Sequence, residues 1–556
     1  MIIGGTLDKL KLISELKELH AKLVEVYKNI FDYKYKTSGK FKAFIDDEYK
    51  KNKIDTKKKQ TWNNNFCHRA SYTLLNRILF IRICEDKGSM LNPEDYVVGV
   101  PRDPYVGQKL SRKGLQKWTN LVTNYTLGEL VKLAFLDMKG SYSNIALYKD
   151  DKYGTLNFTI KEIGSKHLGG DKRIRKLVLQ FEGVLSSIIE KLDTDRFNFI
   201  NVNGSILGDV YENFIDKETR KAIGQFYTPE FVIEYILKNT VAGADVVENP
   251  FVSVADISCG SGHFLIMAYD MLREKFINNL ELLRDKYANE VYTIKKQGEI
   301  KQLSGKDYWT EENIHYHLLK HCIYGADIDS FAVQLTTINL LLKDLDNLTD
   351  ELNIVKCDSL IKWEKDYDWK DLQNQLKEEF EIIKTTQINM LGEEIVHEIK
   401  QRKENYELKY IDSTGLKKFR IITEESAKQI VNLCDFWNTK FDYVVGNPPY
   451  VGHKQLSMDH KEWLLSNYSH VFKDKSDLSF CFFERILDIL SEGGMAGIIT
   501  SRYFMESPTG RNLRKYLQQN AKMKGIVDFY GAEIFKGVGV ATLITVTAVR
   551  MYTPWY

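Results

Sequence analysis

One short stretch, residues 441–450, constrains the fold of this chain more than any other part of the sequence. It reads Phe-Asp-Tyr-Val-Val-Gly-Asn-Pro-Pro-Tyr, so an apolar run typical of a fully buried strand leads directly into Gly-Asn-Pro-Pro. Two consecutive prolines have no N–H donor and fix φ near about −65°, so they cannot continue a hydrogen-bonded ladder. The sequence therefore predicts a rigid turn at the carboxyl end of a strand, where open α/β sheets bind their ligands.

The polar groups of this turn suit a planar base that carries an exocyclic amino group. Asn447 and the carbonyl of Pro448 can accept the two N–H bonds of such a group, and the ring of Tyr450 can cover the face of the base. A turn that merely ends a strand would contain the same residues. The stretches upstream of the turn favour the binding role.

A loop with two glycines follows an earlier predicted strand, residues 253–258. Gly260 and Gly262 lie between this strand and a predicted helix, so a ligand can approach the backbone closely and meet the N–H groups of the helix. The third glycine of the dinucleotide-binding fingerprint is absent. With Asp256 at the end of the strand, the loop is better suited to a ligand with an ammonium group than to a pyrophosphate.

Strands and helices alternate along the C-terminal part of the chain. Further strands are predicted at residues 321–328, 353–358, 494–501, 524–530 and 542–549. This alternation implies an α/β fold with a doubly wound, seven-stranded, Rossmann-like sheet. The short connection before the last strand predicts that this strand runs antiparallel to its neighbours.

Two of these predicted strands end in acidic residues. Asp327 closes the strand at residues 321–328, and an acid at such a position can hold a ribose diol. Asp358 ends the next strand. The intervals around these strands are long, and residues 275–318 and 361–436 read as charged, largely helical insertions.

A conspicuous run precedes the glycine loop. Residues 224–230 read Gly-Gln-Phe-Tyr-Thr-Pro-Glu and lead into an apolar helix over residues 231–237. Thr228 is expected to cap this helix, with Pro229 at its first position. The run is explained either by a well-formed helix start or by a flap whose aromatic and backbone groups contact a cofactor.

Residues 1–200 are expected to form a mainly helical domain, and residues 201–556 a second domain. Apolar residues recur at helical spacing near the N-terminus, and residues 71–84 read as a buried helix. Basic clusters at residues 50–59 and 172–176 are either solvated faces or contacts to phosphate. A fused nuclease would need Glu-x-Lys on a strand, but the candidate triplets lie in helical or highly charged context.

Composition narrows the class of protein. A net charge of +2 excludes a protein that coats polyanions, so any nucleic-acid surface must be a local patch. Seven scattered cysteines, without a C-x-x-C motif or a His pair at ligand spacing, predict a reduced, cytoplasmic protein with no disulfide framework and no metal site. The longest uncharged apolar stretch, residues 537–549, is too short to span a bilayer.

Together these runs resemble the S-adenosylmethionine-dependent adenine-N6 DNA methyltransferases. The resemblance rests on residues 256–265, Asp-Ile-Ser-Cys-Gly-Ser-Gly-His-Phe-Leu, and on residues 446–450, Gly-Asn-Pro-Pro-Tyr. The run at residues 224–229 precedes both, which is the order of the gamma class. The helical N-terminus resembles the methylase part of type IIG restriction-modification enzymes and of BREX- or DISARM-like phage-defence enzymes, and the whole resemblance covers about residues 65–550.

The resemblance implies S-adenosyl-L-methionine as the cofactor and double-stranded DNA as the substrate, with methylation of adenine N6 at specific sites. The residues implied to contact the cofactor are Tyr227, Thr228, Asp256, Gly260, Gly262, Asp327 and Asp358. Asn447, Pro448 and Tyr450 are implied to form the target-base site. The sulfonium of the cofactor is itself the electrophile, so the reaction requires no metal.

The sequence departs from the family in two places. Family members often carry an aromatic residue before the Leu-Arg of the penultimate helix, where residues 508–514 here read Pro-Thr-Gly-Arg-Asn-Leu-Arg; Tyr503 and Phe504 are the nearby aromatic residues. The family's target-recognition domain follows the last strand, whereas this chain ends a few residues beyond it. A separate specificity subunit or a missing C-terminal recognition domain is therefore expected as a partner, possibly with a nuclease.

Other classes of function remain open. A protein or RNA methyltransferase can use the same Asn-Pro-Pro-Tyr turn, although the large N-terminal domain and the early flap argue against that class. A type IIG enzyme with an unrecognised nuclease is a second alternative. A non-catalytic DNA-recognition subunit is a third, but it would not need both methyl-transfer motifs.

Overall fold

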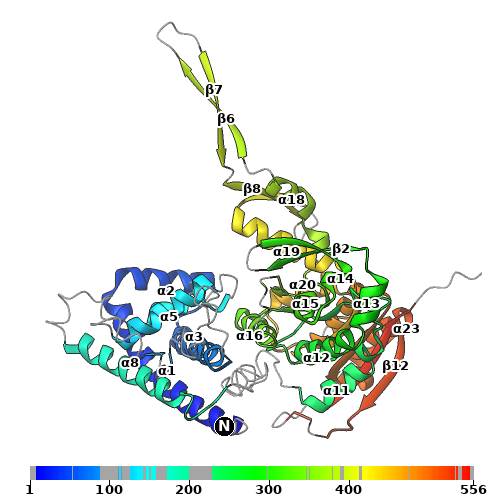
Figure 1. Cartoon of the computed structure of the whole chain (residues 1–556), viewed down its shortest axis with the longest axis horizontal. Helices are drawn as coiled ribbons and strands as arrows, with labels where there is room; N and C mark the ends of the chain where they lie inside the picture. The colour runs from blue at the N-terminus through cyan, green and yellow to red at the C-terminus, as the bar shows by residue number, and fades with distance from the viewer. Residues whose placement is uncertain are drawn as a thin grey trace, which may run out of the picture. The chain divides into compact units, whose positions relative to one another are not determined.

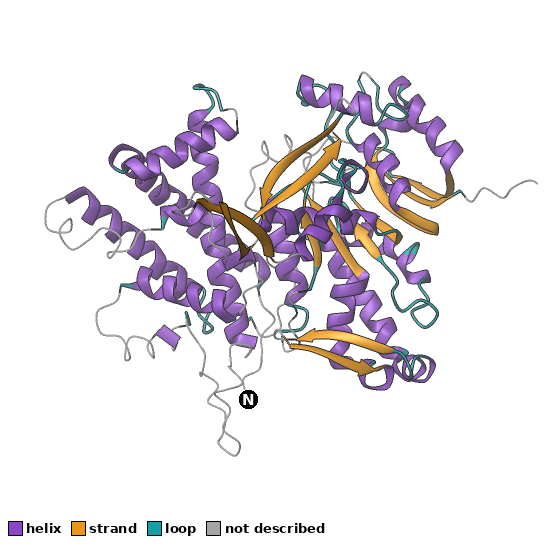
Figure 2. Cartoon of the chain, turned by 90° about the horizontal axis from the view of Figure 1, so that it is seen from above, coloured by secondary structure: helices purple, strands orange, loops and turns teal. Residues whose placement is uncertain are grey.

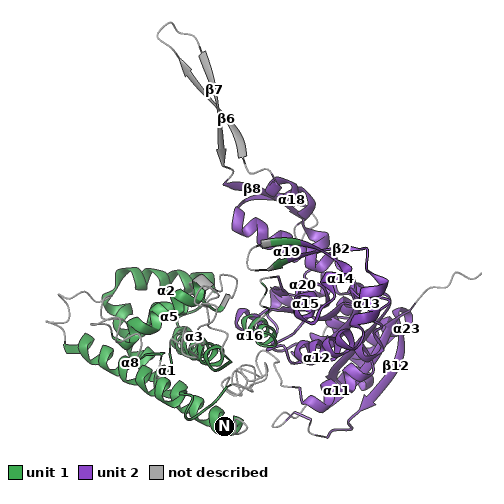
Figure 3. Cartoon of the chain, viewed as in Figure 1, with its two compact units in different colours: residues 1–216, 295–301, 334–350 green, residues 217–294, 302–333, 351–556 purple. Residues whose placement is uncertain are grey.

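The computed structural model separates the chain into two compact units (Figures 1 and 3). Unit 1 comprises residues 1–216, 295–301 and 334–350, and unit 2 comprises residues 217–294, 302–333 and 351–556. The structure describes residues 8–52, 54–87, 110–111, 114–115, 126–141, 146–148, 152–157, 172–199, 228–296, 299–345, 347, 349, 351–377, 380–388, 394–402, 404–411, 416–473, 475–532, 534–535 and 541–550.

Unit 1 is built mainly from helices, as predicted for the N-terminal part of the chain. Its long helices are α1 (Lys9–Thr37), α2 (Gly39–Lys51), α3 (Lys59–Lys87), α5 (Leu127–Ser141) and α8 (Lys172–Lys191). Ser38 ends α1 and caps α2, because its hydroxyl accepts a hydrogen bond from the backbone N–H of Phe41. The two runs considered for a nuclease lie in helices: Glu25-Val26-Tyr27-Lys28 in α1 and Glu48-Tyr49-Lys50 in α2.

The predicted buried helix at residues 71–84 lies within α3, where it carries a fully buried arginine. Arg82 donates to the carbonyl of Leu192 at 3.1 Å and to Asp86 at 2.8 Å, and it also pairs with Glu85. A buried guanidinium is tolerated only when its donors are matched by acceptors. This network therefore joins α3 to the segment that follows α8.

Unit 2 contains the predicted seven-stranded sheet, in the order β12-β13-β11-β10-β1-β4-β5. The strands are β1 (Val254–Asp256), β4 (Ile323–Asp327), β5 (Asn353–Lys356), β10 (Phe441–Gly446), β11 (Leu490–Ser501), β12 (Ala521–Asp528) and β13 (Thr542–Val549). Strands β5, β4, β1, β10 and β11 are mutually parallel, and β13 runs antiparallel to β11 and β12. The predicted fold class and the antiparallel last strand are both confirmed.

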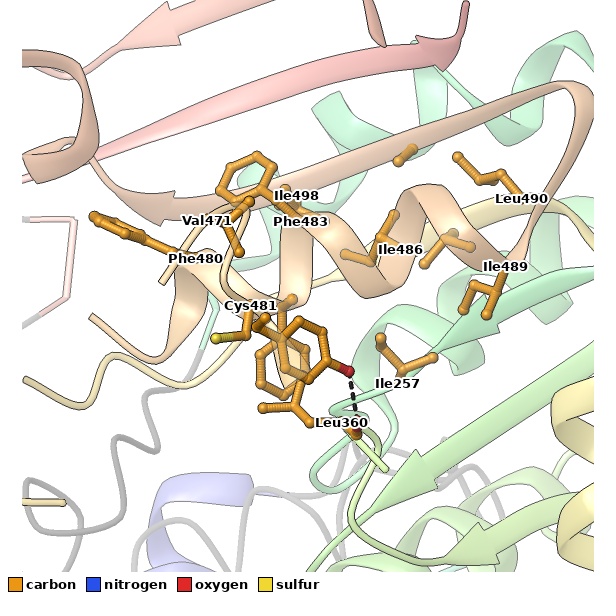
Figure 4. Packing of buried hydrophobic residues seen from close by; sticks show 14 of the residues in the cluster. Ile257, Leu360, Val471, Phe480, Cys481, Phe483, Ile486, Ile489, Leu490 and Ile498 are labelled. Atoms are coloured by element: carbon orange, nitrogen blue, oxygen red, sulfur yellow. Dashed lines mark hydrogen bonds between the residues drawn. The ribbon is translucent and has the colours of Figure 1, made fainter. Parts of the chain in front are cut away.

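Helices pack on both faces of the sheet (Figure 2). One layer includes α11 (Glu230–Lys238) and α12 (His263–Asn278), which contact β11 and β1 respectively. The other includes α19 (Glu424–Asn438), α21 (Ser479–Ile489) and α23 (Arg511–Asn520), whose apolar side chains join the main core cluster. In that cluster, Phe483 and Ile486 of α21 pack near Ile498 of β11 (Figure 4).

The insertions between the strands contain hairpins as well as helices. Antiparallel pairs form between β2 (Val291–Lys296) and β3 (Glu299–Ser304), β6 (Phe380–Ile388) and β7 (Glu394–Arg402), and β8 (Asn405–Ile411) and β9 (Lys417–Thr423). The expectation of helical insertions at residues 275–318 and 361–436 is therefore wrong for these segments. In β8, Tyr406 and Leu408 are buried while Glu407 and Lys409 are not, a period of two that the dense charge obscured.

The two insertions also contain helices, including most of α19 in the second insertion. Residues 275–318 include α13 (Leu280–Lys286), α14 (Gly305–Tyr308) and α15 (Glu311–His317), and residues 361–436 include α17 (Trp363–Asp366) and α18 (Trp369–Lys377). The structure also describes helices α16 (Ser330–Leu341), α20 (Met458–Asn467) and α22 (Tyr503–Glu506). Within the described ranges, no helix has both the length and the apolar character needed to cross a membrane.

Candidate functional site

The two sequence motifs follow the carboxyl ends of the parallel strands β1 and β10, which lie at the same edge of the sheet. Strand β1 lies between β4 and β10, with Asp256 opposite Gly325 and Ala255 opposite Val444. Strand β1 ends at Asp256 and β10 at Gly446. The glycine loop and the Asn-Pro-Pro-Tyr turn, which are far apart in the sequence, therefore leave adjacent strands at the same edge.

The glycine loop is tied directly to the acid at the end of β4. Gly260 has a φ of 53° and donates its backbone N–H to Asp327 Oδ2 at 2.9 Å. Gly262, with a φ of 91°, is the N-cap residue of α12. Both values lie in the left-handed region that residues with a Cβ rarely adopt. The glycines thus allow the loop to turn tightly between β1 and α12 while its backbone contacts Asp327.

The buried carboxyl of Asp256 and the partly buried carboxyl of Asp327 lie close enough at this loop to interact electrostatically. Asp256 is 2% exposed, and burial together with the nearby Asp327 raises its pKa to about 7, against a hydrogen bond from the Ser258 N–H. Burial likewise raises the pKa of Asp327 to about 6, although it accepts backbone hydrogen bonds from Gly260 and Asp329. A cationic ligand would favour the ionised forms of both carboxyls. The pair can therefore hold a ligand with a positive charge.

The end of β10 touches the carboxyl group of Asp256. A Cβ atom added to Gly446 would lie 2.6 Å from Asp256 Oδ1 and 3.0 Å from its Cγ. Any side chain at position 446 would therefore displace this carboxylate. The close approach places the acidic end of β1 directly beside the turn that begins with Asn447.

Asn447 is oriented by Thr228, a residue of the predicted flap. Its Nδ2 donates to Thr228 Oγ1 at 3.1 Å, so Oδ1, a buried atom, is the acceptor of the amide. The prediction that Thr228 caps the next helix is wrong, because Pro229 is the N-cap residue of α11. The Thr228 side chain contacts Asn447 instead. Residues 224–227 of the predicted flap, including Tyr227, lie outside the described residues.

Tyr450 is held rigidly at the end of the turn, and Pro448 is buried before it. The Tyr450 hydroxyl donates to the carbonyl of Ile499 in β11 at 3.2 Å. Burial raises the pKa of this phenol well above its usual value, so the hydroxyl stays protonated. Its ring lies 6.2 Å from the ring of Phe535 at an interplanar angle of 64°, in an edge-to-face arrangement.

Phe535 is a site residue that the sequence analysis missed. Of the two aromatic residues considered there, Phe504 packs in the core against Phe483 at 5.3 Å, whereas Tyr503 is 51% exposed. Phe535 instead lies between β12 and β13, strands whose connection is at the same sheet edge as the Asn-Pro-Pro-Tyr turn. The available signal was an aromatic residue just before the Gly-Val-Gly of this connection.

Asp358 lies two residues beyond the end of β5, in a loop supported by a buried arginine. Its Oδ1 accepts the backbone N–H of Leu360 at 3.0 Å. Arg485 of α21 donates to the carbonyl of Ser359 at 3.0 Å and forms a bidentate pair with Glu364 at 2.9 and 3.0 Å. The guanidinium also lies 4.3 Å from the Trp437 ring centroid. Arg485, which was not predicted from the sequence, therefore fixes the loop that carries Asp358.

The acidic and thiol side chains around this edge do not form a metal centre. Over the ranges that the structure describes, no three His, Cys, Asp or Glu residues are grouped closely enough to hold a metal ion. The chemistry of the edge is that of buried carboxyls, amide and backbone acceptors, and aromatic rings. Such groups bind cations and planar bases.

Two family models match adjoining parts of the chain. Residues 202–383 match the family described as N-6 DNA Methylase, and residues 321–535 match the family described as Eco57I restriction-modification methylase. The two matches overlap in the region of β4 and β5. Together they include Asp256, the glycine loop, the Asn-Pro-Pro-Tyr turn and Phe535.

Curated relatives are similar to parts of this chain. The chain is 25% identical to the type II restriction enzyme and methyltransferase RM.Eco57I of Escherichia coli, over 76% of this chain and 40% of that protein. It is 37% identical to the type II methyltransferase M.BstVI of Geobacillus stearothermophilus, over 17% of each. Among solved structures, it is similar to the type IIL restriction-modification enzyme MmeI in complex with DNA, with 13% identity, 96% of this chain and 57% of that chain covered, and a TM-score of 0.48. The chain thus spans well under half the length of these curated relatives.

Proposed function

We propose that this chain, whose residues 202–535 carry the domain of the N6-adenine DNA methyltransferases, transfers a methyl group from S-adenosyl-L-methionine to N6 of adenine in DNA. In enzyme nomenclature this is a site-specific DNA-methyltransferase (adenine-specific). The observation that carries the proposal is the contact between Asp256 and Gly446, which puts a cation site beside the Asn-Pro-Pro-Tyr turn.

The residues around the glycine loop fit S-adenosyl-L-methionine. Its ammonium and sulfonium charges suit the buried carboxyl of Asp256, because burial raises the pKa of this group and a neighbouring cation would lower it. Asp327 would hold the ribose, since it already lies against the Gly260 N–H. Gly262 would give the ligand access to the start of α12. Asp358, with Tyr227 and Thr228 of the flap, would contact the remainder of the cofactor.

The cofactor supplies an electrophilic methyl group, and the turn at Asn447 would prepare the nucleophile. The lone pair of the adenine amino group is delocalised into the ring, so this nitrogen attacks poorly. Oδ1 of Asn447 and the carbonyl of Pro448 would accept hydrogen bonds from the two N–H groups of this amino group, and these bonds would favour a pyramidal nitrogen. These interactions strengthen as the methyl group is transferred, which lowers the barrier rather than merely binding the base.

Thr228 contributes by fixing the orientation of the Asn447 amide. With Nδ2 bonded to Thr228, the amide presents its oxygen, the atom that the amino group requires. If the amide were rotated, its NH2 group would face the amino group of the base, and two hydrogen-bond donors would meet. Fixing the acceptor before the base arrives avoids the cost of orienting it during the reaction.

The target adenine must leave the duplex to reach this turn, which costs a few kcal/mol. Tyr450 and Phe535 would offset part of this cost, because an aromatic ring stacked on a base contributes about 1–3 kcal/mol. The bond from Tyr450 to Ile499 keeps its ring in place. The edge-to-face arrangement with Phe535 holds the two rings at the boundary of one site.

The proposed partners are double-stranded DNA and a sequence-reading element provided by another protein segment or subunit. The curated relatives are named as a type II restriction enzyme and methyltransferase and as a type II methyltransferase, so the proposed biological setting is restriction-modification or phage defence, with a nuclease as a candidate partner. Bases must be read at their edges in the major groove, since contacts to phosphate position a protein without specifying sequence. The DNA sequence that is recognised would therefore be determined by this sequence-reading element.

Transfer of tritium from methyl-labelled S-adenosyl-L-methionine to unmethylated phage DNA tests the proposal. We expect slow incorporation by the purified chain at low salt and no incorporation by Asn447→Ala. Calorimetry should show that Asn447→Ala still binds the cofactor, because this side chain belongs to the target-base side of the site. Label on protein instead of DNA, or full transfer by Asn447→Ala, would contradict the proposed role of the turn.

A further inference from the structure

The turn that follows β12 holds a tyrosine out in solvent. Tyr530 is 83% exposed and has a φ of 50°, the one positive φ at a non-glycine residue in the part of the chain described. This conformation is unfavourable for a residue with a Cβ, whereas glycine and asparagine adopt it more readily. An exposed ring also contributes little apolar burial. The fold therefore gains little from a tyrosine at this position.

Three interactions hold this ring in place. Asp528 accepts the backbone N–H of Tyr530 through Oδ1 at 2.9 Å and the Arg502 guanidinium through Oδ2 at 3.0 Å. The Arg502 guanidinium lies 5.7 Å from the Tyr530 ring centroid and also pairs with Glu506 at 2.8 Å. The ring is thus supported from one side by an oriented cation. We call Arg502, Asp528 and Tyr530 the rim cluster.

The rim cluster stands at the same sheet edge as the target-base site. Arg502 directly follows β11 and lies three residues after Ile499, whose carbonyl accepts the Tyr450 hydroxyl. Tyr530 precedes Phe535, the partner of Tyr450, in the same connection. Strand β12 is three strands from β10 in the sheet. At ~4.8 Å between strands this separation is about 14 Å, similar to the ~12 Å width of the DNA major groove.

We propose that Tyr530 enters the DNA duplex beside the extruded adenine and stacks on the bases that lost their neighbour. The proposal rests on the function proposed above. Extrusion of a base leaves two unstacked neighbours, and proteins that distort DNA commonly fill such gaps with an inserted apolar side chain. The Arg502 guanidinium behind the ring would hold the ring in the orientation needed for stacking. Tyr530 is thus a positioning residue for the duplex and does not take part in methyl transfer.

A purely structural role makes the opposite prediction for the obvious variant. If Tyr530 served only the turn, Tyr530→Asn would leave DNA binding unchanged, and its melting temperature would equal or exceed that of the wild type, since asparagine suits the backbone. The inserted-ring role predicts the same folding stability but altered DNA binding. DNA binding, measured on a variant whose melting temperature shows that it is folded, therefore separates the two roles.

The test uses fluorescence anisotropy with two duplexes of about 30 base pairs, one intact and one with a central abasic nucleotide that mimics the gap. The wild-type chain and Tyr530→Phe should bind the gapped duplex more tightly, by on the order of tenfold, because both have a ring to stack. Tyr530→Asn should lose this preference. Tyr235→Ala, which removes another exposed tyrosine on the outer side of α11, should keep it.

Two results would overturn the proposal. One is a wild-type chain that binds both duplexes equally well. The other is a Tyr530→Asn variant that is folded and retains the full preference for the gap. Calorimetry with S-adenosyl-L-methionine, performed on the same samples, reports separately on the proposed function. A wild-type chain that does not bind the cofactor would overturn that function, whatever the DNA result.

Discussion

Gly446→Ala probes the contact that joins the two motifs. The added methyl group would lie 2.6 Å from Oδ1 and 3.3 Å from Oδ2 of Asp256. The carboxylate has little freedom to retreat, because it is buried and accepts a hydrogen bond from the Ser258 N–H at 3.0 Å. Either the end of β10 moves away from β1, or the carboxylate gives up this hydrogen bond.

The magnitude follows from these two costs. Forcing a methyl group into a packed site costs about 1–3 kcal/mol, and a hydrogen bond to a buried carboxylate contributes about 1.5–3 kcal/mol. We expect Gly446→Ala to lower the free energy of unfolding by about 2–4 kcal/mol. The melting temperature should fall by roughly 4 °C or more. Affinity for S-adenosyl-L-methionine should fall on the order of tenfold or more, since the displaced group is the proposed cation ligand.

Gly452→Ala is the matched control for this change. Gly452 lies in the same loop, and a Cβ there would meet no atom within 4 Å. Its stability should stay within about 0.5 kcal/mol of the wild type, with unchanged cofactor affinity. Differential scanning calorimetry and titration calorimetry measure both quantities. A Gly446→Ala protein that matched the control in both would show that Asp256 does not lie against the Asn-Pro-Pro-Tyr turn.

Two further predictions concern Arg485 and Asp256. Arg485→Met should lower the free energy of unfolding, measured in urea, by about 3–5 kcal/mol, because it leaves the partly buried carboxylate of Glu364 without its partner. Adding Glu364→Leu should restore much of the loss, and equal stability of the single and double variants would contradict this reasoning. The folded-state pKa of Asp256, about 7, lies above its ordinary value of 3.8, so the folded protein holds a proton that the unfolded chain releases. Stability of the ligand-free protein should therefore fall as pH rises from about 4 to about 7, and S-adenosyl-L-methionine should bind more tightly as Asp256 ionises near about pH 7; Asp256→Asn should flatten both profiles.

The positions of the strands along the chain and the family relationship could be predicted because both depend on short local stretches of sequence. An apolar run that ends in Gly-Asn-Pro-Pro, and another that ends in an acid and two glycines, identify buried strands and their ligand-binding ends without any knowledge of packing. The sheet confirms the first inference, and the two family models confirm the relationship. The roles of the individual site residues remain predictions.

The features that were missed depend on contacts between distant segments. Thr228 looked like a helix cap because Thr-Pro is a common helix start, but Asn447, 219 residues away, engages its hydroxyl. Phe535 meets Tyr450 only because the connection between β12 and β13 lies at the edge where β10 ends. Arg485 reads as one charge in an apolar helix, and its partners Ser359 and Glu364 are more than 120 residues earlier.

The hairpins were missed for a different reason. Alternation over short, highly charged strands such as β8 resembles the polar face of a helix when it is read from sequence alone. The burial of Tyr406 and Leu408 arises from packing on α18 and α19, which the sequence does not place.

The identity of the methylated nucleoside tests the central claim most directly. DNA incubated with the full chain and isotope-labelled S-adenosyl-L-methionine would be digested to nucleosides and analysed by mass spectrometry. The amino-group geometry proposed for Asn447 and Pro448 predicts that the label is recovered as N6-methyladenine. Label recovered as N4-methylcytosine, or only in protein or RNA, would contradict it.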